Sequence, residues 1–150
     1  MEIRPYNEND INEIYRVEQQ SFGNGAYSLL MIRRMLHIPE SLTLVVTVNN
    51  HVKAYATALP EGTDSIDIES IAVLPERQHM GYGSALITAL ESEAFKRGYR
   101  EIFLEVREKN TNAIAFYKKH NYTVIDFIFN YYHLSFNGSR NAYRMSKILE

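Results

Sequence analysis

The chain has 150 residues, of which 45% are hydrophobic and 23% are charged, the amount of sequence that one ordinary domain needs to bury a core. Its formal net charge of −2 argues against nucleic-acid or membrane-surface binding. It has no cysteine, which excludes disulfides, cysteine nucleophiles and thiolate metal sites. No apolar run approaches the roughly 18 residues of a membrane span, and the first ten residues lack the apolar stretch of a signal peptide. We therefore expect a single cytoplasmic domain over residues 1–150. The five histidines show no ligand spacing, so no metal site is expected.

The first 40 residues predict a short strand at residues 2–5 and two helices. Asn7 or Asn9 caps the first helix, whose apolar stripe consists of Ile11, Ile14, Tyr15 and Val17. Residues 22–26 form a loop because of their glycines, and the second helix follows until Pro39 ends it.

The rest of the chain changes from strand hairpins to β–α units. In chain order we expect strands at 42–48, 52–59 and 65–73, a helix at 81–97, a strand at 101–106, a helix at 111–120, and strands at 122–129 and 142–148, with a loop at 130–139. This order predicts an α/β (α+β) fold with a mixed, mostly antiparallel sheet of about seven strands, flanked by about four helices.

A glycine-containing turn joins the strand at 65–73 to the long helix after it. The turn reads Gln78-His79-Met80-Gly81-Tyr82-Gly83, and consecutive backbone N–H groups before a helix form an anion site. The segment matches neither a P-loop nor a dinucleotide fingerprint, since the position of a third glycine is Leu86. On two glycines alone, a plain helix N-terminus is the competing interpretation.

The wider pattern, Q-x-x-G-x-G after a strand that ends I-A-V-x-P, resembles the acetyl-CoA motif of the GNAT acetyltransferase superfamily. The resemblance implies that amides from His79 to Ser84 bind the pyrophosphate and that the strand backbone binds the pantetheine arm. The implied acetyl-CoA contacts are Ile71, Ala72, Val73, Gln78, His79, Met80, Gly81, Tyr82, Gly83, Ser84, Asn110 and Tyr117. His79 and Met80 stand where many relatives carry a basic residue, which weakens the expected phosphate affinity.

Three later blocks narrow the resemblance to RimI-type protein N-terminal acetyltransferases. They are L-E-V-R-x-x-N-x-x-A-x-x-x-Y from residue 104, N-Y-Y from residue 130 and N-A-Y-R-M from residue 141, and the resemblance covers roughly residues 66–148. It implies acetyl transfer from acetyl-CoA to the N-terminal α-amine of a ribosomal or nascent protein. The alternatives are an acetyltransferase for a small amine or a lysine side chain, and a non-catalytic acyl-CoA-binding module. The sequence leaves the acceptor preference open, and we expect a monomer or a weak homodimer.

The resemblance also assigns roles. Glu105 is the implied general base, acting through a water molecule, although a carboxylate in this strand could equally face solvent. Asp67 and Glu69, on the preceding strand, are alternative bases. Tyr117 is implied at the cofactor's sulfur, with core packing as the alternative, and Asn110 both caps a helix and contacts the cofactor.

Phe22, Tyr131 and Tyr132 are the expected acceptor-binding residues. Two adjacent tyrosines in a loop expose large apolar faces unless something packs on them. They either cover the edge of the core or, as the resemblance implies, form a wall of the acceptor cleft.

Overall fold

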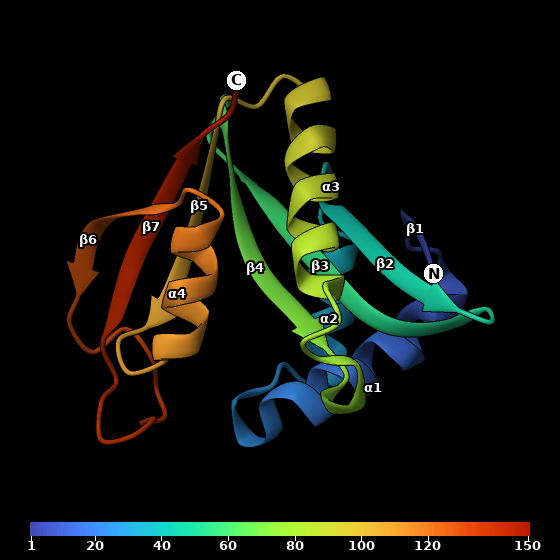
Figure 1. Cartoon of the computed structure of the whole chain (residues 1–150), viewed down its shortest axis with the longest axis horizontal. Helices are drawn as coiled ribbons and strands as arrows, with labels where there is room; N and C mark the ends of the chain where they lie inside the picture. Colours follow the sequence, from blue (N-terminus) through green and yellow to red (C-terminus); the bar gives the residue numbers. More distant parts are fainter.

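The computed structural model describes all residues 1–150, which form a seven-stranded sheet with helices on both faces (Figure 1). The strands are β1 (Glu2–Pro5), β2 (Leu42–Val48), β3 (His51–Glu61), β4 (Ser65–Val73), β5 (Glu101–Arg107), β6 (Thr123–Ile128) and β7 (Ala142–Ile148). The helices are α1 (Ile11–Phe22), α2 (Leu29–Leu36), α3 (Tyr82–Lys96) and α4 (Thr111–Lys119), with short 3-10 turns η1 (Glu8–Asp10), η2 (Gly23–Gly25) and η3 (Pro75–Arg77). The strand order is β1-β2-β3-β4-β5-β7-β6, and only β4 and β5 are parallel. The expected fold class is confirmed.

The sheet has a core on each face. α3 packs on one face of β2, β3 and β4 through apolar residues at helical spacing, including Leu86, Ile87 and Leu90. α1 and α2 cover the opposite face through Ile14 and Ile32, among others. α4 lies on the α3 side of β5 and β7, so the reverse face of the second half of the sheet carries no helix (Figure 1).

β4 and β5 separate before either strand ends. Their last paired residues are Ile68 and Leu104, yet β4 continues to Val73 and β5 to Arg107. A bulge opposite β3 leaves Glu69 as the extra residue of β4, and a bulge bends its strand. The sheet is consequently split between β4 and β5, next to the turn that enters α3.

Several predicted boundaries differ from the structure by one to three residues, and two of these differences have a specific physical reason. α2 ends at Leu36 rather than at Pro39, because the residue before a proline disfavours helical backbone. β6 begins after Tyr122, whose amide instead donates to the Tyr117 carbonyl at the end of α4. No helix combines the length and the apolar character needed to cross a membrane.

Candidate active site

The turn before α3 presents a row of free backbone donors. None of the backbone N–H groups from His79 to Ser84 donates to another group of the protein. His79 (φ 63°) and Gly81 (φ 87°) both adopt left-handed backbone, which folds the segment into a concave loop. Free amides at the positive end of a 15-residue helix form an anion site made of backbone alone.

The two glycines of this turn serve different purposes. Gly81 supplies a positive φ that other residues adopt at a cost. At Gly83, a Cβ atom would lie 3.4 Å from the Phe116 ring, in van der Waals contact, so this glycine is the point where α3 faces α4.

The end of β4 offers its backbone to the split in the sheet. The Val73 carbonyl accepts hydrogen bonds from the Ser21 hydroxyl (3.0 Å) and from the Gln78 side-chain amide (3.2 Å), not from β3. Residues two apart in a strand direct their backbone groups to the same side, so Ile71 also faces the split. An extended chain placed there finds the edge of a strand to pair with.

A cleft of about 560 Å³ joins these features. Its lining includes ten of the twelve expected acetyl-CoA contacts: Ile71, Ala72, Val73, Gln78, His79, Gly81, Tyr82, Gly83, Ser84 and Tyr117. Met80 and Asn110 do not line it. Met80 is largely exposed, and Asn110 caps α4 by accepting a 3.1 Å hydrogen bond from the Ala113 amide.

The cleft also has six lining residues that were not among the expected contacts: Ser21, Arg77, Asn112, Ala113, Phe116 and Lys119. Asn112 and Lys119 share one face of α4 with Phe116, at a spacing of four and then three residues, and Arg77 comes from η3. The helical spacing of the α4 residues was the signal that could have found them. Arg77 and Lys119 provide positive charge near the turn, where His79 and Met80 provide none.

Tyr117 contributes a hydroxyl that remains protonated. Its ring packs edge-on against Phe116 and Tyr122, and burial raises the pKa of Tyr117 to about 12. The group is therefore a hydrogen-bond donor at neutral pH.

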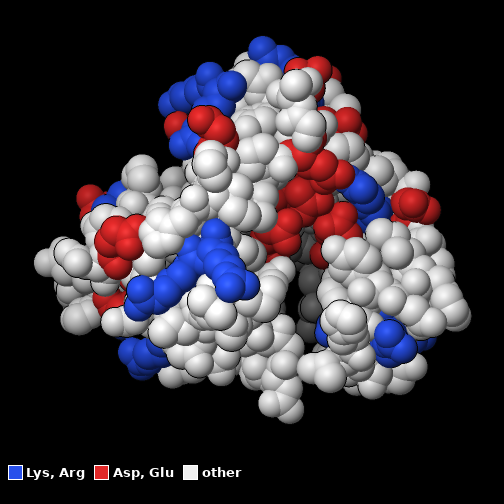
Figure 2. Space-filling view, turned by 180° about the vertical axis from the view of Figure 1, so that it is seen from behind, with Lys and Arg blue, Asp and Glu red and all other residues white.

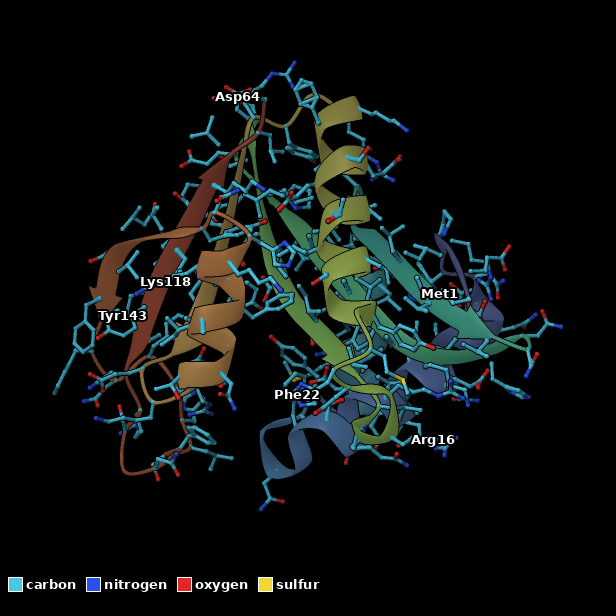
Figure 3. The ribbon with its side chains drawn as sticks, viewed as in Figure 1. Met1, Arg16, Phe22, Asp64, Lys118 and Tyr143 are labelled. Atoms are coloured by element: carbon cyan, nitrogen blue, oxygen red, sulfur yellow. The ribbon has the colours of Figure 1, made fainter.

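Phe22 lies in this larger cleft rather than with the two loop tyrosines. It is 43% exposed and shares the lining with Ser21 and Val73. In Figure 3 it lies at the end of α1, across the opening from α4, where Lys118 is labelled.

A second cleft, of about 340 Å³, opens on the helix-free reverse face of the sheet. Its lining is Leu59, Pro60, Glu61, Asp67, Glu69, Glu105, Ile128, Tyr131 and Arg144. Seen from behind, acidic side chains gather beside a hollow in the middle of the molecule (Figure 2). The cluster brings together the three carboxylates that the sequence left as alternative bases, Asp67, Glu69 and Glu105, on two adjacent strands.

Arg144 partly neutralises this acidic cleft. It lies opposite Glu105 in the β5–β7 register, with 3.5 Å between Nε and the Glu105 carboxylate, and it also forms an ion pair with Glu61. Its guanidinium stacks 4.2 Å from the Phe103 ring. No local pattern singles out Arg144, because its partners are set by the pairing of distant strands.

The carboxyl groups differ in their tendency to ionise. Burial, with the nearby charge of Glu105, raises the pKa of Asp67 to about 10. Burial also raises the pKa of Glu105, although a hydrogen bond with Asp67 and the charge of Arg144 act in the opposite direction. The pKa of Glu69 is raised by burial and by the charge of Glu105, and the Tyr27 hydroxyl donates to it at 3.4 Å.

Of the two loop tyrosines, Tyr131 lines the acidic cleft and Tyr132 supports it. Their rings meet edge-on at 4.9 Å, and the Arg107 guanidinium lies 4.0 Å from the centre of the Tyr132 ring. The Arg140 guanidinium donates to the Tyr132 carbonyl at 2.7 Å. The loop is thus held in place by two arginines.

A buried carboxylate, absent from the sequence-based predictions, fixes the segment before α2. Glu18 accepts hydrogen bonds from the Tyr55 hydroxyl (2.5 Å), the Ser70 hydroxyl (2.8 Å) and the Tyr27 amide (3.0 Å). Its position in the sequence, four residues after the buried Ile14 on the apolar stripe of α1, was the available signal.

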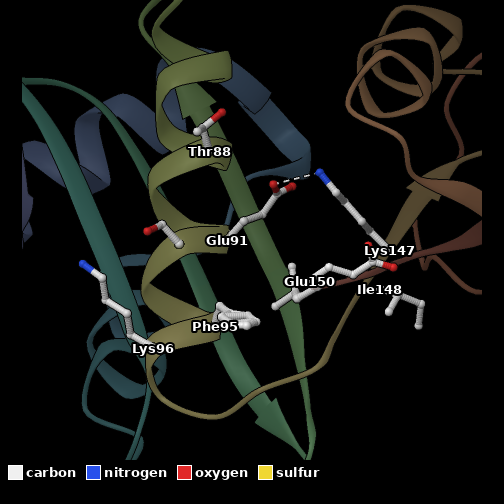
Figure 4. Close-up of a pocket in the computed structure, with 9 residues that line it drawn as sticks. Thr88, Glu91, Phe95, Lys96, Lys147, Ile148 and Glu150 are labelled. Carbon is white, nitrogen blue, oxygen red and sulfur yellow. Dashed lines mark hydrogen bonds and ion pairs between the residues drawn. The ribbon is translucent and has the colours of Figure 1, made fainter.

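A third groove, of about 440 Å³, lies between α3 and the end of β7 (Figure 4). Two of its charged residues are already paired, since Glu91 accepts from both Lys147 and the Tyr122 hydroxyl at 2.9 Å. It shares no lining residue with the two clefts.

Comparison with known proteins agrees with this fold. The model of the acetyltransferase (GNAT) family matches residues 9–122. A ribosomal protein bS18-alanine N-acetyltransferase of Haemophilus influenzae is 30% identical over 146 residues, covering 91% of each chain. The crystal structure of the ribosomal-protein-S18-alanine N-acetyltransferase from Escherichia coli superposes with a TM-score of 0.90, at 28% identity over 99% of this chain and 94% of that one. Ard1 from Thermoplasma volcanium superposes with a TM-score of 0.87, at 31% identity over 99% of this chain and 97% of that one.

Proposed function

Since the chain belongs to the acetyltransferase (GNAT) family and is an acetyl-CoA-dependent protein N-acetyltransferase, we propose that its acceptor is the N-terminal α-amine of a ribosomal protein. The amine attacks the acetyl thioester directly. The observation that carries the proposal is the pair of clefts on opposite faces of the sheet, next to the split between β4 and β5. The larger cleft, next to the free amides, suits an anionic cofactor, and the acidic cleft suits a cationic amine.

The larger cleft is the proposed acetyl-CoA site. The free amides from His79 to Ser84 receive the pyrophosphate, and the exposed backbone of Ile71 and Val73 pairs with the pantetheine arm. This arrangement brings the thioester toward the split, where the Val73 amide would donate to its oxygen as negative charge develops.

The acidic cleft is the proposed entry for the amine. An α-amine has a pKa near 7.7–8.0, so roughly 10% is free at pH 7, whereas a lysine at 10.4 is only about 0.04% free. Deprotonating the α-amine therefore costs about 3 kcal/mol less. Glu105, whose pKa is raised by burial, is the proposed base and takes the proton through a water molecule as the tetrahedral intermediate forms.

Tyr117 is proposed to stabilise the departing sulfur by a hydrogen bond. With its pKa near 12, full proton transfer to a thiolate near 8.5 is uphill by about 5 kcal/mol. A hydrogen bond from the Tyr117 hydroxyl to the sulfur, without proton transfer, has the lower free-energy cost. Most of the acceleration then comes from holding amine and thioester together.

The test is acetyl transfer to a peptide with a free N-terminus, measured with Glu105→Gln and with Glu101→Gln as the matched control. Both residues are on β5, but Glu101 lines neither cleft. Glu105→Gln should lower kcat at least a hundredfold with the Kd for acetyl-CoA unchanged, while Glu101→Gln should stay within twofold of the wild type. Equal rates for the two variants would contradict the assignment of the base.

A further inference from the structure

Asp67 is a buried carboxyl group that the proposed reaction does not use. It is only 7% exposed, and its Oδ1 atom has no hydrogen-bond partner in the protein. Nevertheless its side chain lines the acidic cleft, next to the proposed base Glu105. An ionised carboxylate at such a site would carry a large desolvation cost without compensation.

The surroundings of Asp67 contain more negative than positive groups. Its carboxyl lies within hydrogen-bonding reach of two others, those of Glu105 and Glu61. The single cation of the cleft, Arg144, pairs with those two and not with Asp67. The charged and titratable groups that face Asp67 are Glu61 from β3, Glu69 from β4, Glu105 from β5, Arg144 from β7 and Tyr131 from the loop after β6.

Two carboxyl groups in hydrogen-bonding contact share one proton, because two adjacent carboxylates repel. The cation decides which of them ionises. Glu105 is beside Arg144, while Asp67 has no cation and is more deeply buried. The proton therefore resides on Asp67.

We propose that Asp67 is a positioning residue, which stands in the cleft as a neutral carboxylic acid and donates its proton in a hydrogen bond to the Glu105 carboxylate. The hydrogen bond orients Glu105 and keeps it ionised despite its burial. When Glu105 accepts a proton from the attacking amine, the Asp67 O–H bond stays intact. This inference rests on the proposed function, since it assigns Asp67 a part in the work of that base.

The first test measures folding and needs no activity. Unfolding by urea is followed between pH 5 and pH 9 for the wild type and for Asp67→Asn, whose amide is a neutral donor of the same shape. An acid that is protonated only in the folded state stabilises the fold at low pH, and this contribution is lost as the pH rises. The folding equilibrium constant of Asp67→Asn relative to wild type should therefore rise with pH, by up to tenfold per unit. A ratio that does not change with pH would show that Asp67 is ionised in the folded protein and would overturn the proposal.

The second test measures acetyl transfer. Asp67→Leu removes the donor, so kcat/KM at pH 7 should fall at least tenfold and its acidic limb should move to higher pH. Asp67→Asn should restore most of the rate and the original limb. Loss of transfer in Asp67→Asn as complete as in Glu105→Gln would make Asp67 the ionised base and overturn the proposal.

The two tests separate this inference from the proposed function. If the wild type transferred no acetyl group to peptides, the proposed function would fail, yet the folding measurement would still decide the protonation of Asp67. If Asp67→Leu did not fold, Asp67→Asn alone would decide, because it tests both the proton and the base.

Discussion

The Ser70 hydroxyl on β4 donates a 2.8 Å hydrogen bond to the buried carboxylate of Glu18 on α1. The bond joins the first helix to the strand that carries Asp67 and Glu69. The same carboxylate accepts from the amide of Tyr27, and the Tyr27 hydroxyl reaches Glu69. Glu18 thereby connects the packing of α1 to the wall of the acidic cleft.

Replacing Glu18 by Gln should destabilise the fold by about 1–3 kcal/mol, because the amide cannot accept all three donors and one is left unsatisfied. Urea unfolding measures the loss. Glu13→Gln is the control on the same helix, since Glu13 pairs only with the exposed His51 and its loss should cost less than about 0.5 kcal/mol. A similar decrease in the free energy of unfolding in the two variants would argue against the stabilising role of the Glu18 hydrogen bonds.

Gly81→Asp should abolish the stabilisation of the protein by acetyl-CoA. At 100 times its Kd, the cofactor should stabilise the wild type by about 2.7 kcal/mol, which raises Tm by roughly 5–10 °C. The aspartate places negative charge where the pyrophosphate binds. Gly98→Asp is the matched control, because Gly98 follows the other end of α3 with a similar positive φ (98°) and equally open surroundings. It should lower Tm through backbone strain but keep the increase in Tm that acetyl-CoA causes. An equal increase in both variants would contradict the assignment of the turn from His79 to Ser84 as the pyrophosphate site.

Tyr117→Phe should lower kcat by at least tenfold and leave the Kd for acetyl-CoA within about twofold, because the hydroxyl acts on the departing sulfur. Tyr143→Phe is the control; that ring packs against Phe127 and lines neither cleft. Since the pKa of Tyr117 is about 12, its removal should leave the kcat profile between pH 6 and 9 unchanged in shape. A limb that disappears with the hydroxyl would instead mean that Tyr117 transfers a proton.

The pH dependence of kcat/KM should reveal two groups at low pH. Both the acceptor amine and Glu105 must lose a proton before attack, so activity falls as the pH drops below their pKa values, that of Glu105 being raised by burial. The slope of log kcat/KM against pH should approach 2 in the wild type and 1 in Glu105→Gln. Equal slopes would mean that Glu105 does not titrate in the reaction.

Sequence patterns sufficed for the order and type of the elements. Ser65–Val73 and Ala142–Ile148 were predicted to the residue, because their apolar patterns and turn residues are local. The boundary of β6 was wrong, since it depends on the hydrogen bond that Tyr122 makes to α4.

The two clefts were predictable to different degrees. The turn from His79 to Ser84 is contiguous, so a motif could identify it. The acidic cleft is assembled from five strands and a loop, and the role of Arg144 depends on strand register and on pairing with Glu61, 83 positions earlier. The protonation of Asp67 depends on burial, which no local pattern encodes.

The N-terminal α-amine, as acceptor of the acetyl group, can be tested directly against a lysine side chain. The most direct measurement is mass spectrometry of one peptide that carries both a free α-amine and an internal lysine, after incubation with the protein and acetyl-CoA. Tyr131 walls the acidic cleft and should favour an extended N-terminus over a side chain that approaches from mid-chain. We expect acetylation almost entirely at the α-amine, with the KM for the peptide raised in Tyr131→Ala. Predominant acetylation of the lysine would contradict the N-terminal function.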